Sequence, residues 1–132
     1  MTGADDIRLA VAALSDTGLR RAVNEDSYLA EHPVFAVADG MGGYEAGDRA
    51  SAAVVTAFRT HVAGRALADV EAVRDALLAA DELLAAVASD TIRGAGSTVA
   101  GVALTDYDDA PHWLVFNVGD SRVYRFLDGA LE

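Results

Sequence analysis

The segment VFAVADGMGGYEAGDRAS at residues 34–51 constrains the fold more than any other part of the sequence. An apolar run ends at Asp39, and glycine then fills three of the next four positions before an alanine-rich run begins. A turn needs one or two glycines, so three indicate either a very tightly folded backbone or a ligand that lies directly against it. Because the alanine-rich run has helical spacing, we interpret the segment as a strand, a tight turn and a helix.

Two helices are expected after this turn. The first covers residues 46–63, where apolar side chains recur at helical spacing. Asp69 is a suitable N-cap for the second helix, and Glu71 lies near the positive end of its dipole. Apolar residues then alternate steps of three and four from Val70 to Val87. This predicts one continuous stripe that packs on the sheet or on the first helix.

Strands are predicted from apolar runs, most of them rich in β-branched and aromatic residues. They cover residues 7–14, 27–30, 34–38, 97–104, 112–119 and 120–127. The run at 34–38 predicts a buried strand, with Pro33 ahead of it rather than within it. The run at 120–127 is predicted to pair with 112–119 through a turn at Gly119-Asp120. Strands, two helices and further strands indicate one α/β-layered domain with antiparallel pairing.

Composition excludes several function classes. The chain has 132 residues, 52% of them apolar, and a formal net charge of −11. Nucleic acid and anionic membrane surfaces are therefore not expected partners, since both require clustered Lys and Arg. The absence of cysteine excludes disulfides, thiolate chemistry and cysteine-based zinc sites. Two acids precede the first short apolar run, and no run reaches about 18 apolar residues. We therefore expect no secretory signal, no membrane insertion and a cytoplasmic location.

Acidic residues occur at three predicted strand ends, as Glu25-Asp26, Asp39 and Asp120. Each alone is typical of turn and cap chemistry. Asp39 differs because a helix rather than a second strand follows it, and because a charge at the end of a buried strand needs a partner. Carboxylate oxygens, a main-chain carbonyl exposed by glycine and water are the ligands that a hard divalent cation prefers. The sequence therefore indicates a candidate metal site around Asp39.

Arg21 precedes Asp26 by five residues in the same predicted loop. A planar guanidinium beside metal-binding carboxylates suits a phosphate, which it can hold through two parallel hydrogen bonds. A surface ion pair with an acid explains the same pattern equally well, and Arg20 can take either part.

Four motifs follow one another along the chain: RAVNED at 21–26, VADGMGG at 37–43, GSTVAG at 96–101 and NVGDSRVYR at 117–125. Together they closely resemble the metal-dependent serine/threonine protein phosphatases of the type 2C class in their bacterial form, from about residue 8 to the end of the chain. The resemblance implies a layered α-β-β-α sandwich of antiparallel sheets flanked by helix pairs. It also implies that residues 1–132 are the N-terminal part of a single catalytic domain.

The resemblance assigns roles to the acidic positions. Asp39 would bridge two metal ions, and Gly40 would give its main-chain carbonyl to one of them. Glu25 and Asp26 would hold metal-bound waters. Asp120 would help to hold a third, weaker metal. The cofactors implied are Mn²⁺ or Mg²⁺.

The implied reaction is hydrolysis of phosphoserine or phosphothreonine in protein substrates. Arg21 would bind the substrate phosphate. Two cations about 3.5–4 Å apart would lower the pKa of a shared water and hold the transferring phosphoryl group. No phosphoenzyme is required.

The sequence departs from the family pattern in two ways. Tyr44 follows the glycine turn where a histidine is often found, and the three histidines, His32, His61 and His112, match no catalytic position. The general acid is therefore open, and a metal-bound water can serve. The further metal-binding aspartates of the family, in Ser-Asp-Gly and Asp-Asn contexts, have no counterpart in this sequence. We expect this chain alone to be inactive.

The last residues lead to a further expectation. Asp128-Gly129 is a strong hairpin-turn signal, yet only three residues follow it. We expect the preceding strand to keep an unpaired edge with Val123, Tyr124 and Phe126, and the chain to self-associate.

Two other functions are open. A non-catalytic module of the same fold would bind metal weakly or bind a partner protein. A nucleotide-binding domain would use the glycine turn to hold phosphate, but no Gly-Lys-Ser/Thr follows the turn and no G-x-G-x-x-G is present.

Overall fold

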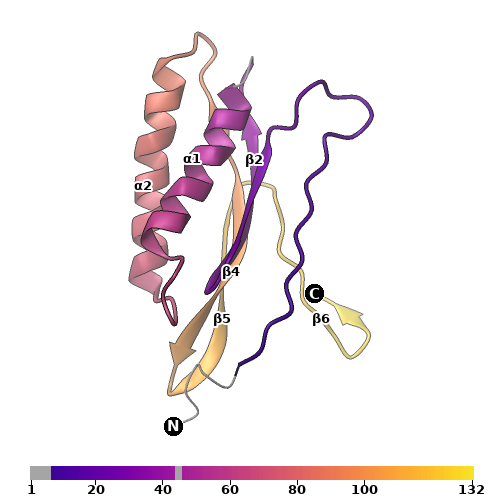
Figure 1. Cartoon of the computed structure of the whole chain (residues 1–132), viewed down its shortest axis with the longest axis vertical. Helices are drawn as coiled ribbons and strands as arrows, with labels where there is room; N and C mark the ends of the chain where they lie inside the picture. Colours follow the sequence, from indigo (N-terminus) through magenta and orange to yellow (C-terminus); the bar gives the residue numbers. More distant parts are fainter. Residues whose placement is uncertain (1–6, 44–45) are drawn as a thin grey trace.

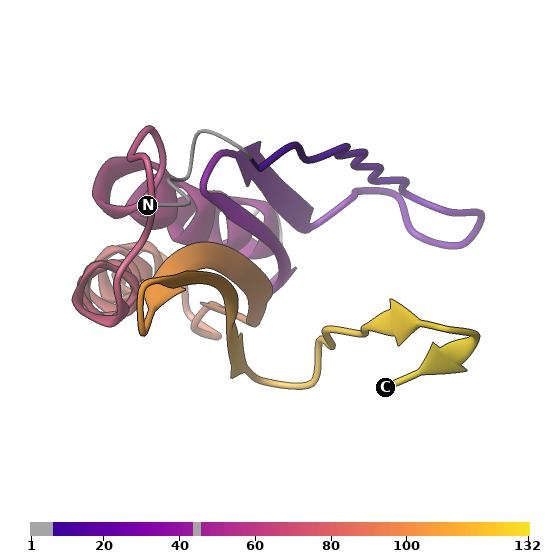
Figure 2. The same cartoon turned by 90° about the horizontal axis from the view of Figure 1, so that it is seen from below.

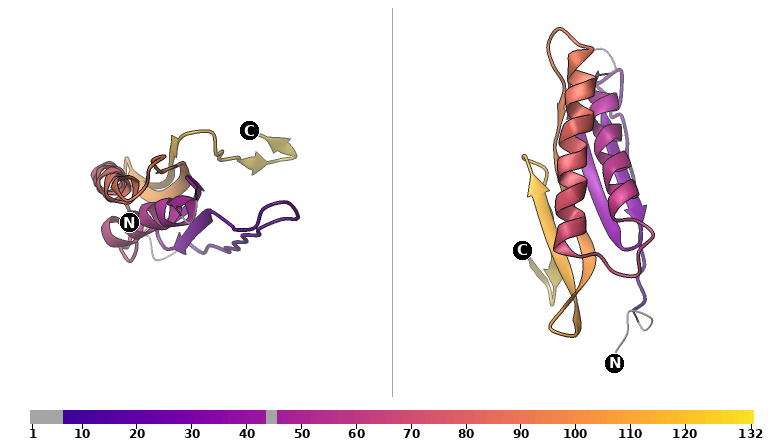
Figure 3. Two further views of the ribbon diagram at one scale, coloured as in Figure 1. Left: turned by 90° about the horizontal axis from the view of Figure 1, so that it is seen from above. Right: turned by 90° about the vertical axis from the view of Figure 1, so that its left-hand side faces the viewer.

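The computed structural model describes residues 7–43 and 46–132. Helices α1 and α2 lie side by side on one face of an antiparallel sheet (Figure 1, Figure 3). The sheet has five strands in the order β1-β2-β4-β5, with the short β3 also paired to β2. A separate hairpin consists of β6 and β7. The elements are β1 (Asp26–Glu31), β2 (Val34–Met41), α1 (Ala46–His61), α2 (Val70–Ser89), β3 (Gly96–Ser97), β4 (Val99–Tyr107), β5 (Ala110–Val118), β6 (Phe126–Leu127) and β7 (Ala130–Leu131).

The sheet has one helix-covered face and one open face, and β2 shows both. Val34 and Ala38 are 0% and 2% exposed on the helix side, whereas Val37 between them is 49% exposed. The prediction of a buried strand at 34–38 is therefore wrong for one face. The reason is that an antiparallel sheet needs cover on only one side, so successive side chains alternate between core and surface.

The core lies between this sheet and the two helices. Phe58 of α1 is 1% exposed and stacks on Phe116 of β5, with ring centroids 4.9 Å apart. The remaining core side chains are mostly Val and Ala, which allow the helices to approach the sheet closely. The predicted stripe on α2 is confirmed from Val73 onward, but Val70 is 61% exposed.

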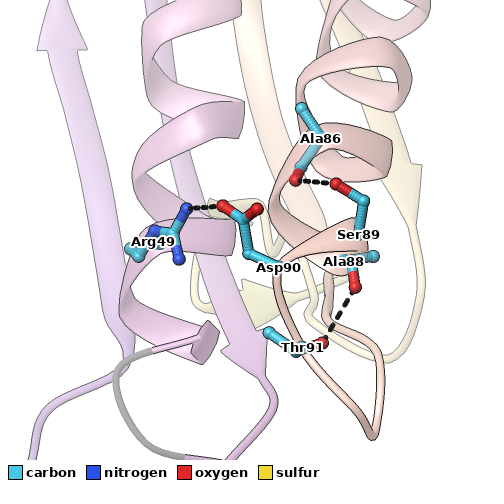
Figure 4. Close-up of polar contacts among 6 residues, drawn as sticks. All are labelled: Arg49, Ala86, Ala88, Ser89, Asp90 and Thr91. Atoms are coloured by element: carbon cyan, nitrogen blue, oxygen red, sulfur yellow. Dashed lines mark hydrogen bonds and ion pairs between the residues drawn. The ribbon is translucent and has the colours of Figure 1, made fainter.

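Both ends of α2 are capped by side chains. The predicted N-cap is confirmed, since the Asp69 carboxylate accepts a hydrogen bond of 2.6 Å from the backbone N–H of Ala72. At the other end, the hydroxyl groups of Ser89 and Thr91 donate to main-chain carbonyls, and Asp90 pairs with Arg49 of α1 at 2.8 Å (Figure 4). This pair is exposed and adds little stability. It does join the start of α1 to the end of α2.

Residues 7–17 contain no helix or strand, so the predicted strand at 7–14 is wrong. Leu14 is 89% exposed, and no strand in the described part of the chain pairs with this segment. An apolar run becomes a strand only where another backbone supplies hydrogen-bond partners. Figure 2 shows this segment and the C-terminal hairpin extending away from the helices.

The predicted strand at 120–127 is also wrong in most of its length. Residues 121–125 have no regular structure, and only Phe126 and Leu127 form a strand. The turn at Asp128-Gly129 is confirmed, with positive φ angles of 50° and 81°. The residues after it pair with 125–127 rather than leaving them unpaired, so that part of our expectation is wrong.

The two-residue turn between β4 and β5 contains no glycine. Asp108 and Asp109 both have positive φ angles, of 55° and 56°, as a two-residue hairpin of this kind requires. Aspartate tolerates this conformation better than most residues do.

Neither helix in the described part of the chain is long and apolar enough to cross a membrane.

The Phe58–Phe116 stack gives a test of the fold. We expect Phe58→Ala to lower the free energy of unfolding by about 3–5 kcal/mol, because it leaves a cavity between α1 and the sheet. Val115→Ala is the matched control, since Val115 is 57% exposed on the open face of the same strand as Phe116. It should cost about 1 kcal/mol or less. Urea unfolding measures both, and equal losses would contradict the arrangement of the two faces.

Candidate functional site

A cavity of about 680 Å³ opens where the loop before β1, the end of β2, the glycine turn and the loop after β5 meet. All six positions assigned from the sequence line it: Arg21, Glu25, Asp26, Asp39, Gly40 and Asp120. Arg20, the alternative to Arg21, is not among the lining residues. The topology therefore brings together residues that lie up to 99 positions apart in the chain, from Arg21 to Asp120.

Asp26 and Asp39 face each other across the β1–β2 hairpin, where they are register partners. Desolvation raises the pKa of the Asp26 carboxyl, and the neighbouring Asp39 carboxylate raises it further by charge and by a hydrogen bond. Glu25 adds a smaller contribution in the same direction. The cavity therefore holds carboxylates whose charges repel each other, and a bound cation would relieve this repulsion.

Glu25 lies against the first turn of α1. A Cβ atom added at Gly47 would lie 2.6–2.9 Å from the carboxyl atoms of Glu25, so any other residue there would displace this carboxyl group. A Cβ added at Gly40 would lie 1.8 Å from the carbonyl oxygen of Gly47. The backbone N–H of Gly40 also donates to the Glu25 carbonyl at 3.1 Å. These contacts place Glu25 between β2 and the positive end of the α1 dipole, which favours a carboxylate.

The close packing answers the question raised by the glycine turn. Gly40 is glycine because α1 approaches the backbone of β2, and Gly42 has a φ of 145°, which other residues rarely adopt. Gly47 was missed by the sequence analysis, which treated its segment only as a helix. A glycine in the first turn of a helix was the available signal, since glycine is unfavourable inside helices.

The backbone of Asp39 is fixed by Thr98, which the sequence analysis also did not single out. The N–H of Asp39 donates to the Thr98 hydroxyl at 3.1 Å, and the N–H of Thr98 donates to the Asp39 carbonyl at 2.9 Å. Thr98 is 6% exposed and itself lines the cavity. Thr98 belongs to the motif GSTVAG, but the motif does not indicate this contact, because it joins two segments that are far apart in the sequence.

The loop that carries Arg21 is shaped by short polar contacts. Asp16 accepts a 2.6 Å hydrogen bond from the backbone of Gly18, and Asn24 donates to Ser15 at 2.6 Å. Asp16 lines the cavity beside Arg21, and the sequence analysis gave it no role. The side chain of Asn24 also accepts from the backbone of Asp26 at 3.0 Å. These bonds hold the loop at the entrance of β1.

The oxygen donors share a cavity, but in the described part of the chain their side chains do not converge on one point. Among residues 7–43 and 46–132, no three acidic or histidine side chains converge closely enough to hold a metal ion by themselves. None of the three histidines lines the cavity. Tyr44 lies outside the described residues. The arrangement can supply carboxylates, glycine backbone and one guanidinium to a cation and a phosphate together.

Comparison with known proteins gives consistent matches. Residues 20–132 match the model of the family described as Protein phosphatase 2C. The chain is 36% identical over 130 residues to the serine/threonine protein phosphatase PstP of Mycobacterium tuberculosis, covering 93% of this chain and 24% of PstP. It therefore spans about a quarter of that curated relative.

Solved structures agree with the fold. The PPM Ser-Thr phosphatase MsPP of Mycobacterium smegmatis, in complex with cacodylate, matches with a TM-score of 0.82 and 31% identity over 94% of this chain and 51% of MsPP. The catalytic domain of PstP with two manganese ions matches with a TM-score of 0.80 and 34% identity, over 91% of this chain and 52% of that domain. The predicted fold class, mixed α/β with antiparallel pairing, is confirmed. The chain belongs to the protein phosphatase 2C family.

Proposed function

We propose that this chain is the N-terminal part of a catalytic domain that hydrolyses phosphoserine and phosphothreonine in proteins with the help of divalent cations. One observation carries the proposal. Asp39, Asp26, Glu25, Asp120 and Arg21, from three separate segments, line a single cavity in a fold shared with serine/threonine phosphatases.

The donor set fits divalent cations. Asp39 and the Gly40 carbonyl would hold two ions, Mn²⁺ or Mg²⁺, while Glu25 and Asp26 would hold their waters and Asp120 a weaker third ion. Hard oxygen donors of this kind suit both metals. Desolvation raises the pKa of Asp26, and the Asp39 and Glu25 carboxylates raise it further by repulsion, which a bound cation would relieve. The PstP catalytic domain, of which this chain spans about half, binds two manganese ions. Divalent cations, when bound, supply a water of lowered pKa and neutralise phosphate charge.

The residues of this chain have separate tasks in the reaction. Arg21 would grip two phosphate oxygens in parallel and so orient the phosphorus toward the carboxylates. Gly42 and Gly43 line the cavity and carry no side chains, so a phosphate on a protein surface could come close to the backbone there. The Glu25 carboxyl group already lies against Gly47, in the first turn of α1, in the absence of a substrate. This preorganisation lowers the reorganisation needed during phosphoryl transfer.

A second function is favoured by one observation. Because no three acidic or histidine side chains in the described ranges converge on one point, the chain also fits a non-catalytic module that binds metal weakly or binds a partner protein. The two functions differ in whether bound Mn²⁺ leads to hydrolysis.

The first experiment tests the role of Asp39. In the intact protein, we expect Asp39→Asn to lower Mn²⁺-dependent hydrolysis of a phosphothreonine peptide at least about 100-fold, because cation stabilisation of the transition state amounts to several kcal/mol. Asp106→Asn, at an exposed position of β4, is the control and should keep full activity. A near wild-type rate for Asp39→Asn would contradict the assignment. Wild-type protein that binds Mn²⁺ but hydrolyses nothing would favour the non-catalytic module.

The second experiment tests the packing of Glu25. Alanine has the higher helix propensity, by about 1 kcal/mol, yet Gly47→Ala should weaken Mn²⁺ binding about 10-fold or more, because the new Cβ displaces the Glu25 carboxyl. Gly96→Ala is the control, since its Cβ would make only an ordinary contact of 3.6 Å with Met41. Calorimetric titration measures both affinities. Unchanged Mn²⁺ affinity of the Gly47→Ala variant would contradict the assignment of Glu25 to the metal site.

The third experiment uses the raised pKa of Asp26. Its folded-state pKa lies above the unfolded value, so the folded state loses stability as pH rises and Asp26 ionises. Without metal, Asp26→Asn should therefore raise the melting temperature at pH 7. The gain should disappear near pH 3, where Asp26 is protonated in both states. Asp106→Asn should show no such pH dependence. Destabilisation by Asp26→Asn at pH 7 would show that repulsion among the carboxylates is not significant.

A further inference from the structure

Thr98 lies at the break between β3 and β4, opposite Asp39. Opposed residues of an antiparallel pair can exchange two main-chain hydrogen bonds. Only one of these is present here, from the N–H of Thr98 to the Asp39 carbonyl at 2.9 Å. The N–H of Asp39 instead donates to the Thr98 hydroxyl at 3.1 Å. A side-chain oxygen therefore replaces the main-chain acceptor at the residue that would bridge the metals.

The same hydroxyl has a second partner. Its oxygen lies 2.6 Å from the hydroxyl oxygen of Ser121, which directly follows Asp120. Because the Thr98 oxygen already accepts from Asp39, its own proton can be donated to Ser121. One hydroxyl thus joins the end of β2 to the loop after β5.

The methyl group of Thr98 makes an independent contact with that loop. A Cβ added at Gly119 would lie 2.7 Å from the Thr98 methyl carbon, and Gly119 has a φ of 105°. The backbone of Gly119 therefore packs directly on Thr98. The side chain of Asn117 also donates to the carbonyl of Ser121. These contacts take segment 119–121 away from the sheet, which explains why it does not continue β5.

We propose that Thr98 is a positioning residue that couples Asp39 to Asp120 by fixing the loop after β5 relative to the end of β2. It touches neither metal nor phosphate in this role. The consequence for metal binding rests on the proposed function, whereas the coupling itself is a property of the metal-free protein.

Two substitutions separate this role from ordinary packing. Thr98→Val keeps the methyl contact with Gly119 and removes the hydroxyl. Thr98→Ser keeps the hydroxyl and removes the methyl. If Thr98 only fills space, Thr98→Ser should loosen the structure more than Thr98→Val. If its hydroxyl couples the two segments, Thr98→Val should loosen the structure more.

The first readout is hydrogen exchange of the intact, metal-free protein, followed by mass spectrometry. We expect Thr98→Val to speed exchange at Asp39 and across 119–122, and Thr98→Ser to exchange like the wild type. Ser121→Ala removes only the second partner, so it should loosen 119–122 and leave Asp39 protected. This variant also decides the question if Thr98→Val does not fold. Unchanged exchange in 119–122 for Ser121→Ala, or equal loosening by valine and serine at position 98, would overturn the coupling.

The second readout is calorimetric titration with Mn²⁺. We expect about 10-fold weaker binding by Thr98→Val, the size of effect typical of residues that orient metal ligands, and rescue by Thr98→Ser. Wild-type affinity in Thr98→Val would overturn the role in metal binding. If the wild-type protein itself bound no Mn²⁺, the proposed function would fail, and the exchange comparison would still decide whether Thr98 couples the two segments.

Discussion

The close approach of α1 to the end of β2 is the contact on which the rest of the structure depends. It is possible only because Gly40 has no side chain, since a Cβ there would lie 1.8 Å from the Gly47 carbonyl oxygen. The same approach brings Val54 and Phe58 of α1 onto the sheet and places the start of the helix against Glu25. A wider separation of α1 from β2 would open the core and remove the contact between the first turn of α1 and Glu25. Core packing and site geometry therefore depend on the same glycine.

The carboxylates of the cavity work against folding. Desolvation and the neighbouring Asp39 carboxylate raise the pKa of Asp26, so the metal-free protein loses stability as Asp26 ionises. The alanine- and valine-rich core must offset this cost, as is common where a site is strained or repulsive. Cation binding would turn the repulsion into attraction, so folding and metal binding should reinforce each other.

The open face of the sheet is apolar, although an open antiparallel face is usually polar. Tyr28, Val37, Trp113 and Val115 are 45–57% exposed there. The α-β-β-α sandwich of the family accounts for this, because its two sheets pack face to face. The described part of the chain supplies one sheet and one helix pair, and it spans about half the length of its solved relatives. The cavity residues Asp26 and Asp39 belong to the two strands whose Tyr28 and Val37 are exposed on this face.

Sequence reasoning succeeded where the cause is local. Helical spacing and the Asp69 cap predicted α2, because periodicity and capping depend on residues within one or two turns. The strands at 7–14 and 120–127 were predicted on the same local grounds and were wrong, because a strand also needs a partner. The candidate site also divides into residues that sequence motifs indicate and residues whose contacts arise only between distant segments. The family resemblance indicated six positions that line one cavity, whereas Gly47 and Thr98 make their contacts with residues on distant segments. Thr98 bonds to the backbone of Asp39, and Gly47 leaves room for the carboxyl group of Glu25, so the importance of both depends on contacts that only the folded chain creates.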